Sequence, residues 1–370
     1  MRKILWLVLA IWGGAPWPAL SQDKPPADLQ VSAKLEPAEF GFRFDDNVFR
    51  AVSVNGRFSD EIYLVNLGGE LGARLDIFSG SLSYRFGADQ YQLYSTLSNL
   101  KNDLSLFLSA DPGPLSIYYK KEYYFRNSQY FEFDYVDDDN LLGLLWTPPG
   151  PWSYEVQYKN YYRQYTNDSA DTPLFSVRSL EFVDQALLLS VERTFTERLS
   201  LKLEGGYNNR EFRRNPIGLM NNDPAQPMNL PGTQVDQTWS LLLNAHLYFE
   251  SILQDINFEE QRTNSNSYGF SNTIESVSWA GVVRPVSTLY LQLFFRLYFK
   301  NYDVTPLISP DLQLGFVDED SQDLLSIRTT WEWSPQWMAS IGVSRARSEA
   351  DQAGQYYIKN ILSAQVRKNF

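Results

Sequence analysis

Long stretches of the chain alternate between apolar and polar side chains with a repeat of two residues. The clearest stretch is 288–300, in which every second residue from Leu289 to Phe299 is Leu or Phe. The residues between them are polar or aromatic and include Gln292, Arg296 and Lys300. Successive side chains of a β-strand point to opposite faces, so this spacing predicts a strand with one apolar and one polar face.

About sixteen segments share this character. The predicted strands are 36–51, 61–77, 82–93, 103–110, 115–125, 140–146, 152–165, 179–195, 199–212, 237–249, 252–263, 270–283, 288–302, 323–333, 337–348 and 355–370. Tight turns, predicted for example at 79–81, 148–151 and 284–285, alternate with longer polar connections such as 213–236. Strands of this length cross a membrane when tilted, since about 9–11 residues suffice.

This arrangement predicts an all-β fold, a transmembrane antiparallel up-and-down β-barrel of about 16 strands over 36–370. Closure is required because an open sheet edge in lipid would leave backbone groups without hydrogen bonds. A large β-sandwich or solenoid is the alternative, but it would not explain an apolar face on nearly every strand. One residue does not fit: Lys121 falls on the apolar face of 115–125, so either a bulge shifts the register there or the residue lies near the outer rim.

The N-terminus predicts export. Arg2 and Lys3 precede an apolar run over 4–12, and a small-residue site ends at Ser21, so residues 1–21 form a predicted signal peptide. The polar residues 22–35 form a predicted short periplasmic tail. The chain has no cysteine, which excludes a disulfide framework, a thiolate metal site and a lipid anchor on cysteine.

Charge and composition narrow the function further. Without Arg2 and Lys3 the mature chain keeps 30 of the 32 basic residues against 44 acidic ones, a net charge of −14. An acidic surface disfavours nucleic acid as a partner. The mean hydropathy of −0.34 excludes a helical membrane protein but not a barrel with a polar interior. The 23 Tyr, 23 Phe and 10 Trp suit the aromatic girdles of such a barrel.

Two segments carry a resemblance to a known family. The last predicted strand ends in Phe370 and resembles the C-terminal insertion signal of bacterial outer-membrane β-barrels, apart from Lys368 on its apolar face. The segment GFRFDDNVFR (41–50) is similar to the opening strand of a β-barrel porin family. The resemblance implies a location in the bacterial outer membrane, with membrane lipid and the barrel assembly machinery as partners. A homo-oligomer is left open.

The inward faces of the strands supply candidate pore-lining residues. The basic candidates are Arg296, Lys300, Arg328, Lys359 and Arg367, and the acidic ones are Glu204, Asp255 and Glu259. If these form opposed rows, they would set a transverse field that orients dipolar solutes. The alternative is a mixed-charge lumen in which the groups pair with one another.

Inward tyrosines form a second candidate set, with two interpretations. The pore-lining aromatic candidates are Tyr118, Tyr161, Tyr290, Tyr298 and Tyr357. Their rings could stack on sugars and so line a carbohydrate path, but packing of the wall is favoured.

Candidates for chemistry are few. His246 is the only histidine, and no G-x-S-x-G segment accompanies it, so an enzyme is not expected. The acidic run 137–140 could hold a divalent cation, but a solvated loop end is favoured. The loop 213–236 could fold into the mouth as a gate or lie outside as a contact surface. No metal site and no cofactor are expected.

The predicted function is a porin-like outer-membrane channel for passive passage of hydrophilic solutes, since a barrel of about sixteen strands leaves an aqueous channel. Two alternatives stay open. The resemblance implies an exit pore for a secreted polysaccharide, and a surface adhesion or structural barrel with a filled lumen belongs to a different class.

Overall fold

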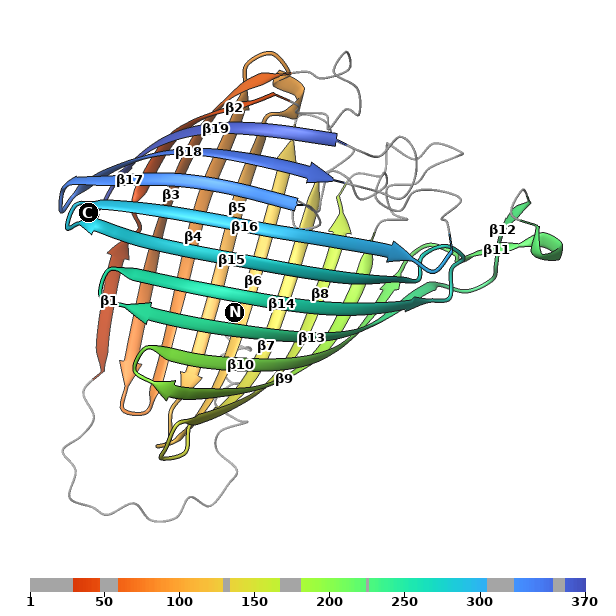
Figure 1. Cartoon of the computed structure of the whole chain (residues 1–370), viewed down its shortest axis with the longest axis horizontal. Coiled ribbons are helices and arrows are strands. Elements are labelled where there is room, and N and C mark those ends of the chain that lie inside the picture. Colours follow the sequence, from red (N-terminus) through yellow and green to blue (C-terminus); the bar gives the residue numbers. More distant parts are fainter. Residues whose placement is uncertain are drawn as a thin grey trace, which may run out of the picture.

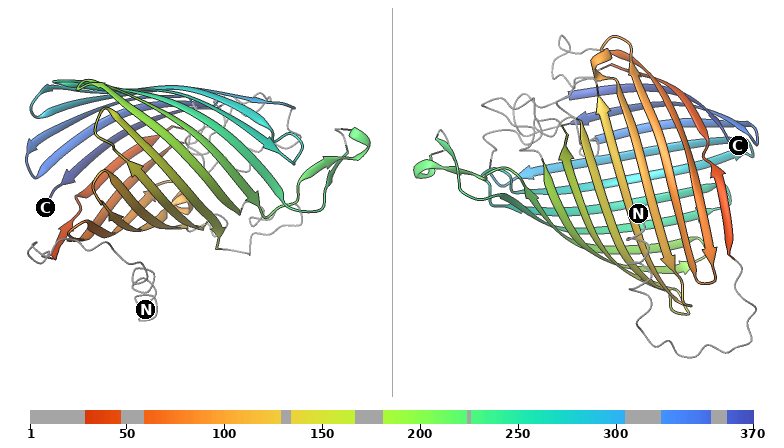
Figure 2. Two further views of the ribbon diagram at one scale, coloured as in Figure 1. Left: turned by 90° about the horizontal axis from the view of Figure 1, so that it is seen from below. Right: turned by 180° about the vertical axis from the view of Figure 1, so that it is seen from behind.

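The computed structural model describes residues 29–46, 59–128, 134–166, 181–223, 226–304, 323–348 and 357–370. Its wall is a closed barrel of sixteen antiparallel strands (Figures 1 and 2). The elements are β1 (Gln30–Leu35), β2 (Ala38–Asp45), β3 (Asp60–Leu75), β4 (Phe78–Tyr91), η2 (Ser95–Leu97), β5 (Asn99–Ala110), β6 (Leu115–Ser128), β7 (Tyr135–Trp146), β8 (Trp152–Tyr165), β9 (Phe182–Thr196), β10 (Leu199–Phe212), β11 (Ile217–Leu219), η5 (Met220–Asn222), β12 (Pro227–Asn229), β13 (Gln234–Phe249), β14 (Ile252–Ser265), β15 (Asn272–Val286), β16 (Leu289–Tyr302), β17 (Asp323–Ser334), β18 (Trp337–Ser348) and β19 (Tyr357–Lys368). The predicted fold class and strand number are therefore confirmed.

Consecutive strands pair along the wall, and the last strand pairs with the first. β19 lies antiparallel to β2, with Ile361 opposite Asp45 and Lys368 opposite Ala38. At the outer end of this seam the backbone N–H of Asn360 donates to Asp46 Oδ1 at 2.6 Å, and its side-chain amide donates to Asp46 Oδ2 at 2.6 Å. The closed seam leaves no free edge between β2 and β19 over these residues, as a barrel in lipid requires.

The first strand begins earlier than the sequence predicts. β1 pairs with the C-terminal half of β3, and β2 pairs with the N-terminal half, so β1 and β2 form one strand that is interrupted at Pro37. From Leu35 to Glu39 the chain advances four residues, while the partner strand moves three, from Gly69 to Asn66. The extra residue is a β-bulge at a proline, which cannot donate to the ladder. Residues 30–35 are thus part of the wall and not of a tail. The predicted signal peptide lies outside the described residues.

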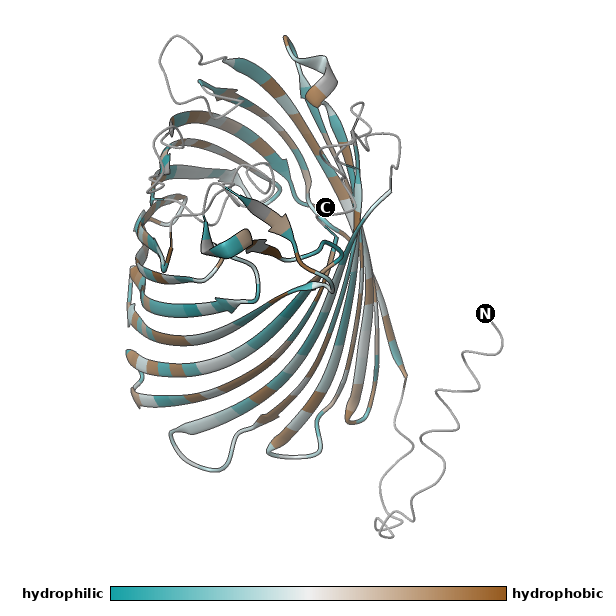
Figure 3. Ribbon diagram, turned by 90° about the vertical axis from the view of Figure 1, so that its right-hand side faces the viewer, coloured by the Kyte–Doolittle hydropathy of each residue, from teal (hydrophilic) through white to brown (hydrophobic). Residues whose placement is uncertain are grey.

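The two faces of the wall are inverted relative to a protein folded in water. Ile341 exposes 62% and Leu71 57% of their surface on the outer face, whereas Asp60 and Glu181 expose only 1%. Apolar and polar residues alternate along the strands in Figure 3. Large apolar residues on the outside are expected only where lipid covers them. None of the helices in the described part of the chain has the length and apolar character needed to cross a membrane.

The two ends of the barrel differ in their connections. Seven short turns lie at one end, at 76–77, 111–114, 147–151, 197–198, 250–251, 287–288 and 335–336. In outer-membrane barrels short turns face the periplasm and longer loops face outward. Two turn predictions are wrong. The first turn is at 76–77 and not 79–81, with Asp76 at a φ of +53°. β15 continues through Arg284 and Pro285, because a bulge before Val286 accommodates the proline.

Lys121 does lie on the outer face, and the bulge that the sequence allowed is absent. The register of β6 against β7 is continuous, so no bulge turns the side chain inward. Its ammonium donates to both carboxylate oxygens of Asp138 at 2.7 and 2.9 Å and to Asn140 Oδ1 at 3.2 Å. The outward charge is neutralised by a neighbour on the same face.

Candidate functional site

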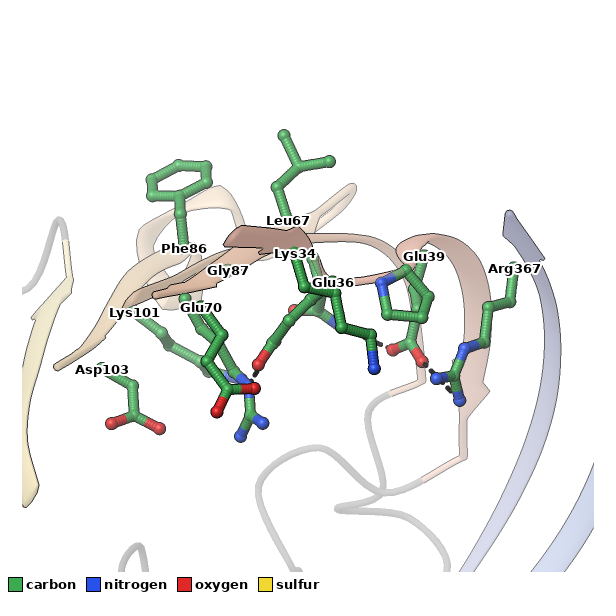
Figure 4. A pocket seen from close by; sticks show the side chains of 13 residues that line it. Lys34, Glu36, Glu39, Leu67, Glu70, Phe86, Gly87, Lys101, Asp103 and Arg367 are labelled. Carbon is green, nitrogen blue, oxygen red and sulfur yellow. Dashed lines mark hydrogen bonds and ion pairs between the residues drawn. The ribbon is translucent and has the colours of Figure 1, made fainter. Parts of the chain in front are cut away.

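The inner face of the barrel is the candidate site, since it carries the polar residues of nearly every strand. Near the seam it contains a hollow of about 560 Å³ lined by parts of β1 to β5 and by Arg367. In Figure 4, Leu67 and Phe86 point away from this hollow, whereas Glu70, Lys101 and Asp103 point into it. This is the strand alternation that the sequence predicts, seen from the side of the lumen.

The charges around the hollow balance. Its basic side chains are Lys34, Arg85, Lys101 and Arg367, and its acidic ones are Glu36, Glu39, Glu70 and Asp103. Arg85 Nε donates to Glu36 Oε2 at 2.5 Å. Gly68 leaves room for this ion pair, because a Cβ at position 68 would lie 2.6 Å from Glu36 Oε2. The hollow is therefore polar but carries no net charge.

Ion pairs between neighbouring strands fix the inner wall from β7 to β10. Arg163 forms two hydrogen bonds to Asp137, at 2.7 and 2.8 Å. Arg210 pairs with Asp184 at 2.8 Å on the next strands. Paired charges of this kind hold the side chains against the wall and neutralise each other, so they contribute little field to the lumen.

The five predicted basic residues lie on β16, β17 and β19, at the predicted places on these strands. Lys359 pairs with Asp45 at 2.7 Å across the seam, and Arg367 lies 3.8 Å from Glu39. Arg328 is exposed and has no ion pair or hydrogen bond within the described ranges. Arg296 and Lys300 lie on the same face of β16, four residues apart.

The three predicted acidic residues do not form a row opposite the basic ones. Asp255 and Glu259 lie on β14, which is separated from β16 by β15 alone. Glu204, on β10, pairs with Lys202 at 2.9 Å. The hypothesis of two opposed rows is therefore wrong for β14, because strands two apart in the chain are two apart in an up-and-down wall. The alternative of local pairing fits Glu204.

The predicted pore-lining tyrosines pack against the wall. Tyr118 donates to Glu155 Oε1 at 2.6 Å, and Tyr290 donates to Glu332 Oε2 at 3.2 Å. Tyr161 packs against Phe182 with 5.5 Å between ring centroids. Tyr298 lies beside Arg296 and Lys300 on β16, and the side chain of Tyr357 lies outside the described part. Wall packing therefore accounts for the described tyrosine contacts.

The His246 side chain forms a hydrogen bond with a carboxylate. Its Nδ1 is hydrogen-bonded to Asp255 Oδ1 on the adjacent strand. Ser200 stands opposite His246 on the other side, yet no hydrogen bond joins the two within the described structure. A serine nucleophile needs such a bond to its base. The arrangement gives no support to a hydrolytic site.

The acidic run 137–140 lies inside a strand and not at a loop end. β7 begins at Tyr135, so the run is inside a strand and its side chains alternate between faces. Asp137 pairs with Arg163, and Asp139 pairs with Lys159 at 2.9 Å, whereas Asp138 points outward to Lys121. Among the described residues no group of three or more metal-binding side chains occurs.

The connection between β10 and β13 forms a hairpin, β11–β12, that projects away from the wall (Figures 1 and 2). At its base the Arg214 guanidinium lies 4.5 Å from the Phe212 ring and 4.8 Å from the Phe270 ring. Its Nε donates to Gln234 Oε1 at 2.7 Å. Burial lowers the pKa of Arg214 to about 10, and it remains charged at neutral pH. Of the two predictions for this loop, an external surface fits the geometry.

Sequence reasoning missed the buried Asp60. Its carboxylate accepts backbone hydrogen bonds from Glu61, Gln92, Leu93 and Tyr94 at 2.7–3.1 Å, and so fixes the connection between β4 and β5. An aspartate at the first residue of a strand gives no signal of this role, because three of its four partners lie more than 30 residues away.

Comparison with known proteins shows the fold. No protein-family model matches the chain, and no curated protein matches it. OmpT, an outer membrane protein of Vibrio cholerae, aligns over 95% of this chain and 100% of that chain at 8% identity, with a TM-score of 0.51. The anion-selective porin from Comamonas acidovorans aligns over 93% and 100% at 9% identity, with a TM-score of 0.50. OprB from Pseudomonas putida aligns over 91% and 94% at 6% identity, with a TM-score of 0.52. The chain therefore has the closed-barrel fold of outer-membrane porins.

Proposed function

We propose that the protein is an outer-membrane channel for the passive passage of hydrophilic solutes. The observation that carries this proposal is the polar inner face of a closed barrel whose outer face is apolar. Barrels of sixteen strands are wide enough for an aqueous channel. In this proposal the signal peptide 1–21 directs export, and Phe370 marks the last strand for the barrel assembly machinery. The channel needs no cofactor and performs no chemistry.

Two other functions remain as alternatives from the sequence. An exit pore for a secreted polysaccharide would use aromatic rings as a sugar path, but the hydroxyl groups of Tyr118 and Tyr290 donate hydrogen bonds to carboxylates of the wall. A structural barrel would have a filled lumen. The hollow of about 560 Å³ beside β1–β5 favours open space on the inner face over a filled lumen.

Single-channel recording in planar lipid bilayers tests the proposal. Purified and refolded protein is added to one side of a membrane, and stepwise conductance increases are expected. A folded barrel that inserts into the bilayer without any conductance would contradict the channel and favour a filled lumen. Export of polysaccharide is tested separately, by loss of extracellular polymer in a deletion strain with unchanged uptake of small solutes.

A further inference from the structure

The inner face of β16–β19, a sector of four strands, carries more basic than acidic side chains. Its charged side chains are Arg296, Lys300, Arg328, Lys359 and Arg367, which are basic, and Glu332, which is acidic. On one side, the charged inner residues of β14 are Asp255 and Glu259. Within this sector, Lys359 pairs with Asp45 of β2 at 2.7 Å and Arg367 lies 3.8 Å from Glu39 of β2, so these two charges are compensated.

Arg328 stands at the centre of this sector, and no described residue forms an ion pair or hydrogen bond with its guanidinium. Its cross-strand partners are Gln292 on β16 and Gly342 on β18, and neither is acidic. Glu332, the acidic residue on the same face of β17, lies four positions further along and accepts a hydrogen bond from Tyr290. The guanidinium of arginine stays protonated at any physiological pH, so this charge is permanent.

The side chains that flank Arg328 are small. On β18 the inner residues next to it are Ser340, Gly342 and Ser344. On β19, Ser363 stands opposite Gly342. Hydroxyl groups can donate hydrogen bonds to an anion and replace part of its hydration shell. A permanent charge with weak donors around it is suited to transient binding, which passage through a channel requires.

We propose that the β16–β19 sector is the path of small anionic solutes, such as carboxylates or phosphates, and that the channel prefers anions over cations. The inference rests on the proposed channel function and names the charge class of its solutes. Basic residues on one wall of a narrow aqueous space raise the local concentration of anions and lower that of cations. Arg328 contributes most directly, because its charge is not neutralised by a neighbour.

The test measures ion selectivity in planar bilayers that separate two concentrations of potassium chloride. The reversal potential gives the permeability ratio of chloride to potassium, which we expect to exceed one. A unit positive charge roughly 8 Å from the ion path raises the local concentration of anions and lowers that of cations, each about twofold, and salt screening reduces this effect. Arg328→Gln is therefore expected to lower the ratio about two- to fourfold with the conductance still present.

Two variants serve as controls. Arg328→Lys keeps the charge and is expected to keep the ratio. Arg345→Gln makes the same chemical change on the outer face of β18, opposite Leu325, and is expected to leave the ratio unchanged. A ratio below one in the unaltered protein, or equal ratios for Arg328→Gln and Arg345→Gln, would overturn the anion path while leaving the channel intact. Absence of conductance would instead overturn the channel itself.

Discussion

The Asp138→Asn variant tests whether the outward pair of Lys121 lies within the membrane. Lys121 is six residues along β6 from Leu115, the first residue of that strand. A strand tilted by about 40° rises roughly 2.5 Å per residue, so Lys121 lies about 15 Å from the periplasmic end of β6. This places it near the middle of an apolar band about 25 Å tall. An unpaired lysine at that depth costs about 2–4 kcal/mol.

The expected loss is smaller than the full cost, because hydrogen-bond acceptors remain. Asn140 Oδ1 still accepts from the ammonium at 3.2 Å, and the new amide oxygen supplies another acceptor. We therefore expect Asp138→Asn to lower the free energy of unfolding by about 2 kcal/mol. The double variant Lys121→Met with Asp138→Leu removes both charges and should return stability to within about 1 kcal/mol of the unaltered protein.

Urea unfolding in phospholipid vesicles measures these differences, with the fluorescence of the ten tryptophans as the signal. If Asp138→Asn were as stable as the unaltered protein, Lys121 would not be in the hydrocarbon. The depth worked out from the strand geometry would then be refuted. A loss in the double variant as large as that in Asp138→Asn would show that packing, and not charge, holds this site.

Three further variants probe the wall. Asp60→Ala removes the acceptor of four backbone N–H groups, so it should lower the free energy of unfolding by about 3 kcal/mol and make residues 92–98 accessible to protease. Unchanged proteolysis would contradict the role assigned to Asp60. Gly143→Val should lower the free energy of unfolding by about 1–3 kcal/mol, because a Cβ at position 143 would lie 2.1 Å from Tyr118 Cζ. The control Gly205→Val, where a Cβ would have no atom within 4 Å, should be nearly neutral. Similar losses of stability in both variants would refute the contact. Phe370→Ala should leave in vitro stability nearly unchanged but lower the amount of folded protein in the outer membrane, and equal amounts would remove the insertion-signal role.

The fold was predictable wherever alternation was strict and a turn residue marked each end. β8, β10 and β18 begin and end at the predicted residues. β7 begins five residues before its predicted start, because Asp138 and Asn140 occupy outer positions where the pattern expects apolar residues. β1 was hidden for a different reason, since Pro37 shifts the register by one residue and breaks the alternation between β1 and β2.

The candidate site was only partly predictable. The face of each predicted basic residue follows from counting positions along the strand. The partner of each charge does not, because it depends on the register between strands, and a shift of two residues keeps every side chain on its face while changing every pair. The pairing of Arg163 with Asp137, and the lack of a partner for Arg328 among the described residues, therefore required the three-dimensional arrangement.

The joining of β2 to β19 also constrains biogenesis. The hydrogen bonds between Asn360 and Asp46 connect positions 314 residues apart. Bringing together chain ends this far apart costs about 5 kcal/mol of entropy beyond a constant contribution. The closing bonds form only after the final residues have reached the membrane, and until then two strand edges remain unpaired. A chain truncated before β19 is therefore expected to keep two unpaired strand edges and to be prone to aggregation.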